Sequence, residues 1–118
     1  MAKHKRPFDQ NLVDAINKLN WPLINNDGVK VFLRCAARNE TGAEHIAGKL
    51  HDLKVRDIEL LPIVLKQPIS IKNDRRKGKL YFGKRRGMNK APFLKIVVRV
   101  LKDGTETIIT VCSSKRCS

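Results

Sequence analysis

Aromatic residues and long apolar runs are both scarce in this chain of 118 residues. Phe, Trp and Tyr make up 5% of the sequence, which weakens any function that depends on stacking single-stranded bases on aromatic side chains. The same scarcity favours duplex or structured RNA as a nucleic-acid partner. No stretch approaches the roughly 20 consecutive apolar residues of a membrane-spanning helix. The basic N-terminus is not followed by an apolar segment, so we expect neither a membrane span nor a signal peptide.

Cysteine is also sparse, and Cys35, Cys112 and Cys117 form no Cys-x-x-Cys pair. The odd count favours reduced thiols in a cytosolic protein, although the spacing of Cys112 and Cys117 also permits a disulfide that closes the tail. No two potential ligands have the spacing of a zinc finger. We therefore expect no metal site and no cofactor.

Acidic residues are few relative to basic ones. The chain has 11 Asp and Glu against 25 Lys and Arg, a net charge of +14. Such a density of positive charge indicates a polyanionic partner, and RNA or DNA is the commonest. The length predicts a single domain over residues 1–118, with enough apolar residues (42%) for one modest core.

The first half of the chain reads as helical. Leu12, Ala15, Ile16 and Leu19 recur at helical spacing, and Thr41 with Glu44 has the spacing of a capping box. Residues 1–40 are expected to form an N-terminal helix and linker region, ahead of a catalytic core over residues 41–118. The expected elements are helices over 9–19, 42–53 and 58–66, the last with Asp57 as N-cap, and a strand over 29–33. Residues 33–38 fit a helix equally well.

After Pro68 the apolar residues alternate with period two, as in half-buried strands. Strands are expected over 69–72, 79–83, 93–101 and 105–112. Helices followed by hairpin-connected strands predict an α+β fold in which N-terminal helices precede a four-stranded antiparallel meander.

Asp103-Gly104 has the sequence of a two-residue hairpin turn. That turn would place Arg99 opposite Ile108 and Lys95 opposite Cys112. Alternation then buries one side of the sheet and leaves a basic open side. The buried side would hold Leu80, Phe82, Leu94, Ile96, Val98, Val100, Thr107, Ile109 and Val111. The open side would hold Lys79, Tyr81, Lys95, Val97, Arg99, Ile108 and Thr110.

His45 is the candidate for proton transfer, with Lys49 one helical turn later on the same face. His51 points elsewhere on the same expected helix, so the two histidines are not expected to act as a pair. Metal-free RNA cleavage needs a group to move protons, cations for the phosphorane and a hydroxyl donor. All of these residue types are present, and no carboxylate cluster suited to Mg²⁺ is evident.

The histidine-bearing segment 43–51, the short helix that ends before Pro68, and the strands around Tyr81, 93–98 and 108–111 resemble the barnase–EndoU–colicin E5/D–RelE-like (BECR) ribonucleases. The resemblance covers residues 41–111 and lies in pattern and element order. It implies a metal-independent endoribonuclease toxin of bacterial or phage origin that cuts RNA, often tRNA, and leaves 2′,3′-cyclic phosphate ends. It also implies an acidic immunity protein or antitoxin as partner, action in the bacterial cytoplasm, and delivery as a secreted or contact-dependent inhibition module.

By the same resemblance, the catalytic candidates are His45, Thr110, Lys95 and Tyr81. The substrate-binding candidates are Lys49, His51, Lys84, Arg85, Arg86 and Arg99. The sequence departs from the barnase branch in lacking an evident catalytic Glu on a central strand, which leaves the general base open, with Lys49 or His51 as alternatives.

Two other functions fit the residues. One is a non-catalytic protein that binds RNA or DNA through phosphate contacts, with affinity that falls steeply with salt. The other is a basic structural or adaptor protein whose partner is an acidic protein. A test for RNA cleavage distinguishes the ribonuclease hypothesis from these two alternatives.

Overall fold

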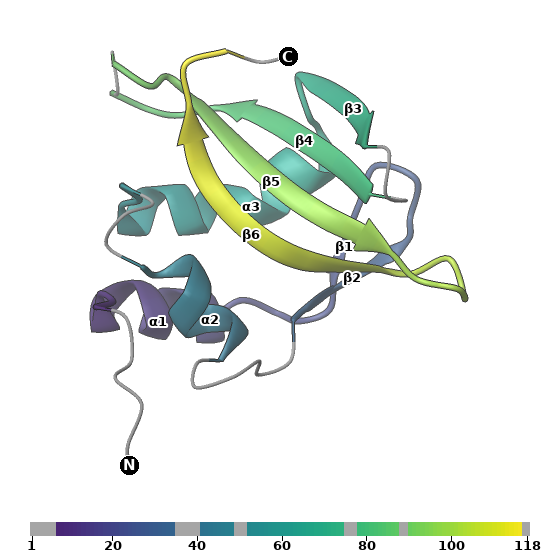
Figure 1. Cartoon of the computed structure of the whole chain (residues 1–118), viewed down its shortest axis with the longest axis horizontal. Coiled ribbons are helices and arrows are strands. Elements are labelled where there is room, and N and C mark those ends of the chain that lie inside the picture. Colours follow the sequence, from purple (N-terminus) through teal and green to yellow (C-terminus); the bar gives the residue numbers. More distant parts are fainter. Residues whose placement is uncertain (1–6, 35–40, 49–51, 75–77, 88–89, 117–118) are drawn as a thin grey trace.

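The computed structural model describes residues 7–34, 41–48, 52–74, 78–87 and 90–116. Within these residues the fold is α+β, as predicted, with helices packed against one mixed sheet (Figure 1). None of the described helices is long and apolar enough to cross a membrane. In chain order the elements are α1 (Gln10–Asn17), β1 (Leu23–Ile24), β2 (Lys30–Leu33), α2 (Gly42–Ile46), α3 (Val55–Lys66), β3 (Ser70–Asp74), β4 (Gly78–Lys84), β5 (Phe93–Val100) and β6 (Glu106–Ser114).

The predicted helix starts are confirmed for α1 and α2. Asp9 caps α1 by accepting a hydrogen bond from the Asn11 amide. Thr41 and Glu44 form the predicted capping box, each side chain accepting from the other residue's amide. The prediction that this helix continues to residue 53 is wrong, because α2 ends at Ile46.

Helix α3 begins three residues earlier than predicted, so Asp57 is its third residue and not its N-cap. The Asp57 carboxylate still satisfies the helix start, because it accepts a hydrogen bond of 2.8 Å from the Lys54 amide. The sequence signal for a cap was therefore real, but it lay inside the first turn.

The sheet has six strands in the order β1-β2-β6-β5-β4-β3 (Figure 1). The predicted four-stranded antiparallel meander is present as β3 to β6. It is incomplete as a prediction, because β2 pairs with β6 in parallel and β1 pairs antiparallel with β2. Parallel pairing joins strands that are far apart in sequence, so no local sequence pattern predicts it.

The loop between β5 and β6 is one residue longer than predicted. The Leu101 amide donates to the Thr105 carbonyl over 2.8 Å, which leaves Lys102, Asp103 and Gly104 in the loop. Gly104 has φ of +89°, a conformation that favours glycine. Arg99 therefore lies opposite Thr107, and the predicted pairing with Ile108 is wrong.

A register shift between Val97 and Val98 restores the predicted pairing farther from the loop. Val97 faces Thr110 and Lys95 faces Cys112, as predicted. The irregularity inserts Ile109 as an extra residue on β6, as a β-bulge does. Consequently Ile108 is buried on the core side with Val98, and the predicted core position of Thr107 is wrong.

The core lies between the sheet and the helices. Its sheet side includes Leu94, Ile96 and Val98 of β5, as predicted, and Val111 of β6. Helix α3 packs on β4 so closely that a Cβ at Gly83 would lie 2.3 Å from Cγ2 of Val64. Glycine at position 83 is therefore a packing requirement.

The predicted orientation of β4 is reversed. Tyr81 pairs with Ile96 and is fully buried on the core side, while Leu80 and Phe82 lie on the other side with Val97 and Lys95. Gly83 explains the reversal. Helix α3 packs so closely on β4 that position 83 must face the helix and must be glycine, and strand alternation then puts Tyr81 on the same side. The hydrophobic pattern alone favoured the opposite choice because Leu80 and Phe82 are the more apolar pair.

Candidate nucleic-acid interface

The face of the sheet opposite the core, called the open face below, carries three of the predicted site residues. Lys95 lies opposite Cys112, Thr110 opposite Val97, and Arg99 opposite Thr107. The pairs that contain Lys95 and Thr110 are two residues apart along the strands, so their side chains are diagonal neighbours on the same face. The prediction that Lys95, Arg99 and Thr110 share one face is confirmed by this register.

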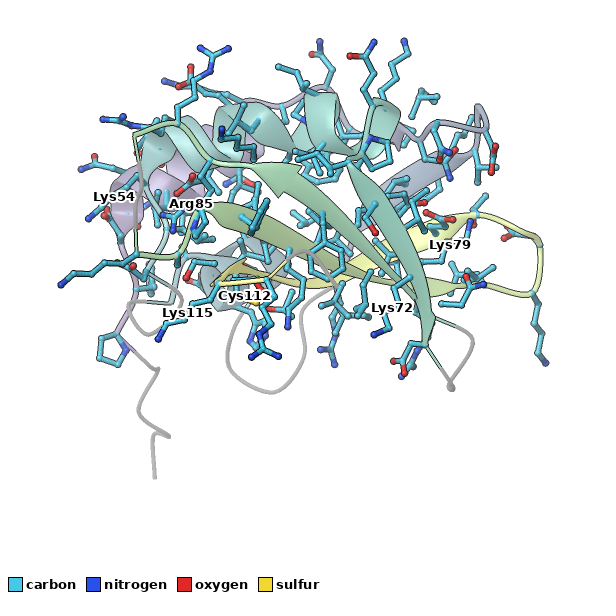
Figure 2. All side chains as sticks on the ribbon, turned by 90° about the horizontal axis from the view of Figure 1, so that it is seen from above. Lys54, Lys72, Lys79, Arg85, Cys112 and Lys115 are labelled. Atoms are coloured by element: carbon cyan, nitrogen blue, oxygen red, sulfur yellow. The ribbon has the colours of Figure 1, made fainter. Side chains whose placement is uncertain are left out.

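Further cations come to the open face from β3 and from the end of β4. Lys72 lies opposite Leu80, and Lys84 lies opposite Phe93, so both point to the side that holds Lys95. Figure 2 shows Lys72, Cys112 and Lys115 on the side of the sheet away from α3. Lys72, Lys84, Lys95 and Arg99 therefore share one surface.

A hollow of about 320 Å³ lies in this face. Its floor is formed by Leu80 and Phe82 of β4, and Lys72 of β3 and Lys95 of β5 lie on either side. Asn73, Asp74 and Ser114 complete the lining. Because Phe82 is only 2% exposed, it supplies an apolar floor and not a broad stacking platform.

Tyr81, a predicted catalytic residue, is placed elsewhere. Its hydroxyl donates a hydrogen bond of 2.6 Å to Glu106 and accepts one of 3.2 Å from Asn25. Glu106, itself 1% exposed, also forms an ion pair of 2.9 Å with Lys79. The predicted open-face positions of Tyr81 and Lys79 are wrong, because both serve this polar network on the core side.

Burial and the contact with Glu106 raise the pKa of Tyr81, while the hydrogen bond from Asn25 opposes the rise. Burial of the ring makes the largest contribution, and the hydrogen bond to the Glu106 carboxylate adds to it. Both effects oppose formation of a tyrosinate beside an existing negative charge. Tyr81 is therefore held in its neutral form, as a hydrogen-bond donor.

Asn25 and Glu106 were not singled out from the sequence. Asn25 belongs to the turn between β1 and β2, where its Oδ1 also accepts hydrogen bonds from the Asp27 and Val29 amides. The Asn-Asn-Asp-Gly signal marked that turn, but nothing in it indicated contact with a strand 56 residues away. Glu106 is the second residue after the hairpin loop, where a charged residue ordinarily faces water.

Arg85, a predicted substrate-binding residue, is also buried. Its guanidinium makes two hydrogen bonds to the Asp57 carboxylate, of 3.0 and 2.8 Å, and others to the Asp52 and Ala91 carbonyls. Arg85 thus fixes the start of α3 to the segment that follows β4. The predicted exposed placement of Arg85 is wrong, whereas Lys84 and Arg86 on either side are exposed.

His45 lies on α2, which packs against α1 and against β6. Ala43, Ile46 and Ala47 form the buried side of this helix, and His45 is half-buried, about 200° around the axis from Ala43. Helix α2 thus packs on the core side of β6, whereas Thr110 points to the opposite side of that strand. Lys49 and His51, two other predicted site residues, lie outside the described residues.

Thiols and metal ligands add little to the described site. Cys112 carries a free thiol on the open face, and Cys117, its predicted alternative partner, lies outside the described residues. Among the described side chains, no three or more His, Cys, Asp or Glu residues are grouped so as to hold a metal ion. The open face thus offers ammonium, guanidinium and hydroxyl groups, which suit a phosphodiester.

Comparisons with protein-family models, curated proteins and solved structures found no match for this chain.

Proposed function

We propose that this protein is a metal-independent endoribonuclease that binds RNA on the open face of its sheet. The observation that supports this most directly is the placement of Lys95 beside Thr110, with Arg99, Lys72 and Lys84 on the same face. Cations at this density attract the RNA backbone, and a lysine next to a hydroxyl suits the phosphate that reacts.

In the proposed reaction the RNA 2′-hydroxyl loses its proton and attacks the adjacent phosphorus. The bond to the 5′-oxygen breaks, that oxygen receives a proton, and a 2′,3′-cyclic phosphate remains. Lys95 and Arg99 stabilise the negative charge of the phosphorane, and Thr110 donates a hydrogen bond to a phosphoryl oxygen. His45 is proposed for proton transfer from its residue type and from the BECR resemblance. Helix α2 packs on the core side of β6, opposite the face of Thr110, so the RNA would have to reach His45 around the sheet.

Two residues leave the proposed catalytic and binding sets. Tyr81 has its hydroxyl bonded within the core, and Arg85 has its guanidinium bonded to Asp57 and two carbonyls. Their substitution is expected to change stability before it changes catalysis. tRNA as the substrate, and an acidic immunity protein or antitoxin as the partner, stay predictions from the BECR resemblance.

The test is to incubate the protein with total bacterial RNA in EDTA, resolve the products and analyse their 3′ ends. Discrete fragments that end in cyclic phosphate are expected. His45→Ala and Lys95→Ala should each slow cleavage by about 100-fold or more, the usual contribution of a proton-transfer group or of a transition-state donor.

Lys66→Ala, which removes an exposed cation at the end of α3, is the matched control and should cleave like the wild type. Undiminished cleavage by a folded His45→Ala protein would remove His45 from the mechanism. Fragments that form only with added metal would contradict the metal-independent reaction.

A non-catalytic RNA-binding protein is the second candidate. It is favoured by the burial of Tyr81, which takes a hydroxyl away from the open face. Phosphate-binding cations remain on that face, namely Lys72, Lys84, Lys95 and Arg99. Intact RNA after long incubation at low salt, together with salt-sensitive binding, would decide for this candidate.

A further inference from the structure

The open-face hollow has features that phosphate attraction alone does not require. Phosphate-binding surfaces need only cations, yet this hollow has Leu80 and Phe82 as its floor between Lys72 and Lys95. The volume of about 320 Å³ lies at the lower end of the range for small-molecule sites. An apolar floor between two cations matches the chemistry of one nucleotide, which has a flat base flanked by phosphates.

The positions of the two lysines suit a strand that crosses the sheet. Lys72 is on β3 and Lys95 on β5, with β4 between them. Neighbouring strands are about 4.8 Å apart, and Lys72 is level with Val97, two residues from Lys95, which together place the two lysine backbones roughly 12 Å apart. Flexible side chains at that separation can reach the phosphates on the two sides of one base.

A larger hollow, of about 460 Å³, lies near the β5–β6 loop and is the weaker candidate. Two cations line it, Lys79 and Lys102. Lys79 forms an ion pair with the buried Glu106, so its charge is largely neutralised within the protein. The open-face hollow combines cations on both sides with an apolar floor, and Asp74 lines it as it lines the larger hollow.

We propose that the open-face hollow is a binding site for one unpaired nucleotide, so that the RNA recognised is single-stranded at this point, as in a loop. The inference rests on the proposed RNA-binding face and names the form of RNA that it selects. In a duplex the base is stacked and paired, which keeps it from the floor formed by Leu80 and Phe82. Unpaired bases are the part of RNA that proteins reach most readily.

The experiment measures binding of 2′-O-methyl oligonucleotides, which lack the attacking hydroxyl and cannot be cleaved by the proposed reaction. Three probes of equal length are compared by fluorescence anisotropy: a single strand, the same strand in a blunt duplex, and the same strand with abasic positions. The intact single strand should bind about threefold more tightly than the abasic strand, which is less than a base stacked on an exposed aromatic ring contributes, because Phe82 is 2% exposed. It should also bind more tightly than the duplex.

Two variants locate the preference. Leu80→Ser keeps the charge and should remove most of the advantage of the intact strand over the abasic one. Lys72→Gln should weaken binding of the single strand, while Lys66→Gln on α3 should not. Equal affinity for all three probes, or an unchanged base preference in folded Leu80→Ser protein, overturns the inference.

The outcome is separable from that of the proposed function. Base preference without cleavage of natural RNA would keep the nucleotide site and reject the ribonuclease. Cleavage of natural RNA with no base preference would keep the ribonuclease and reject the site.

Discussion

At the scale of single residues, Glu106 shows how a buried charge is accommodated in this protein. Its carboxylate receives a hydrogen bond from Tyr81 on one oxygen and an ion pair from Lys79 on the other. Burying a carboxylate without such partners costs several kcal/mol. The network thus explains why Tyr81 and Lys79 point into the core side of β4.

Tyr81→Phe removes one of the two donors and keeps the ring. The variant is expected to lose about 1–3 kcal/mol of the free energy of unfolding, because Glu106 stays buried with an unsatisfied oxygen. Urea denaturation followed by the fluorescence of Trp21, the single tryptophan, measures the loss. A loss below about 0.5 kcal/mol, the range of ordinary surface substitutions, would mean that water replaces the hydroxyl.

The raised pKa of Tyr81 also predicts a dependence of stability on high pH. An unfolded tyrosine ionises near pH 10, whereas burial and Glu106 hold the folded group neutral above that value. The stabilisation is therefore fully present below about pH 10 and declines as the pH rises further, because only the unfolded chain then loses the proton. Tyr81→Phe should lack this part of the decline.

Tyr81 is the single tyrosine of the chain, so tyrosinate absorbance reports it without interference. The folded protein should titrate at a higher pH than the protein in denaturant. Coincident titrations would contradict the network.

At the scale of elements, the contact between α3 and β4 depends on Gly83. A methyl group there would meet Val64 at 2.3 Å, well inside van der Waals contact. Gly83→Ala is expected to destabilise the fold by about 1–3 kcal/mol, the usual cost of overpacking. Val64→Ala makes room, so the double variant should be more stable than the sum of the two single losses predicts.

A double-mutant cycle from urea denaturation measures this coupling. Gly78→Ala is not a neutral control, since a Cβ there would lie 2.8 Å from the Val98 carbonyl. Gly28→Ala is a useful comparison, because a Cβ there would meet no other atom within 4 Å while φ is +78°. Its loss of stability therefore measures backbone strain without any steric clash. Strict additivity of Gly83→Ala and Val64→Ala would show that the two elements shift apart instead.

The elements also show how far the sequence leads. Caps and periodicity located α1, the start of α2 and the strands of the meander, because these signals are local. The length of the β5–β6 loop and the bulge at Ile109 were not predicted. Each shifts the strand register by one residue, and the two shifts compensate, so the predicted pairing of Val97 with Thr110 is still correct. Within the candidate site, strand alternation correctly placed Lys95, Arg99 and Thr110 on one face, and the roles of these residues stay predictions.

The remaining errors have one cause, which is long-range contact. The orientation of β4 is decided by Val64 against Gly83 and by Asn25 and Glu106 around Tyr81. The burial of Arg85 is decided by Asp57, 28 residues earlier in the chain. A hydrophobic pattern reports burial along one strand and carries no information about these partners.

At the scale of the whole molecule, the net charge of +14 would attract RNA to any surface, so the location of the charge needs its own test. Lys72→Gln, Lys95→Gln and Arg99→Gln together remove three charges from the open face. The matched control, Lys18→Gln, Arg56→Gln and Lys66→Gln, removes three from the helix side, where all three side chains are exposed. Both triple variants have a net charge of +11, that is +14 − 3.

If the open face binds the RNA backbone, the two triple variants differ despite their equal charge. The slope of log affinity against log salt should become shallower by about 2 in the open-face variant, since each phosphate contact to a single strand contributes about 0.7. The helix-side variant should keep nearly the wild-type slope. Titration of an uncleavable single strand over a range of salt concentrations measures both slopes. Equal slopes in the two variants would mean that RNA affinity depends only on the total charge. That result would contradict the open face as the binding surface.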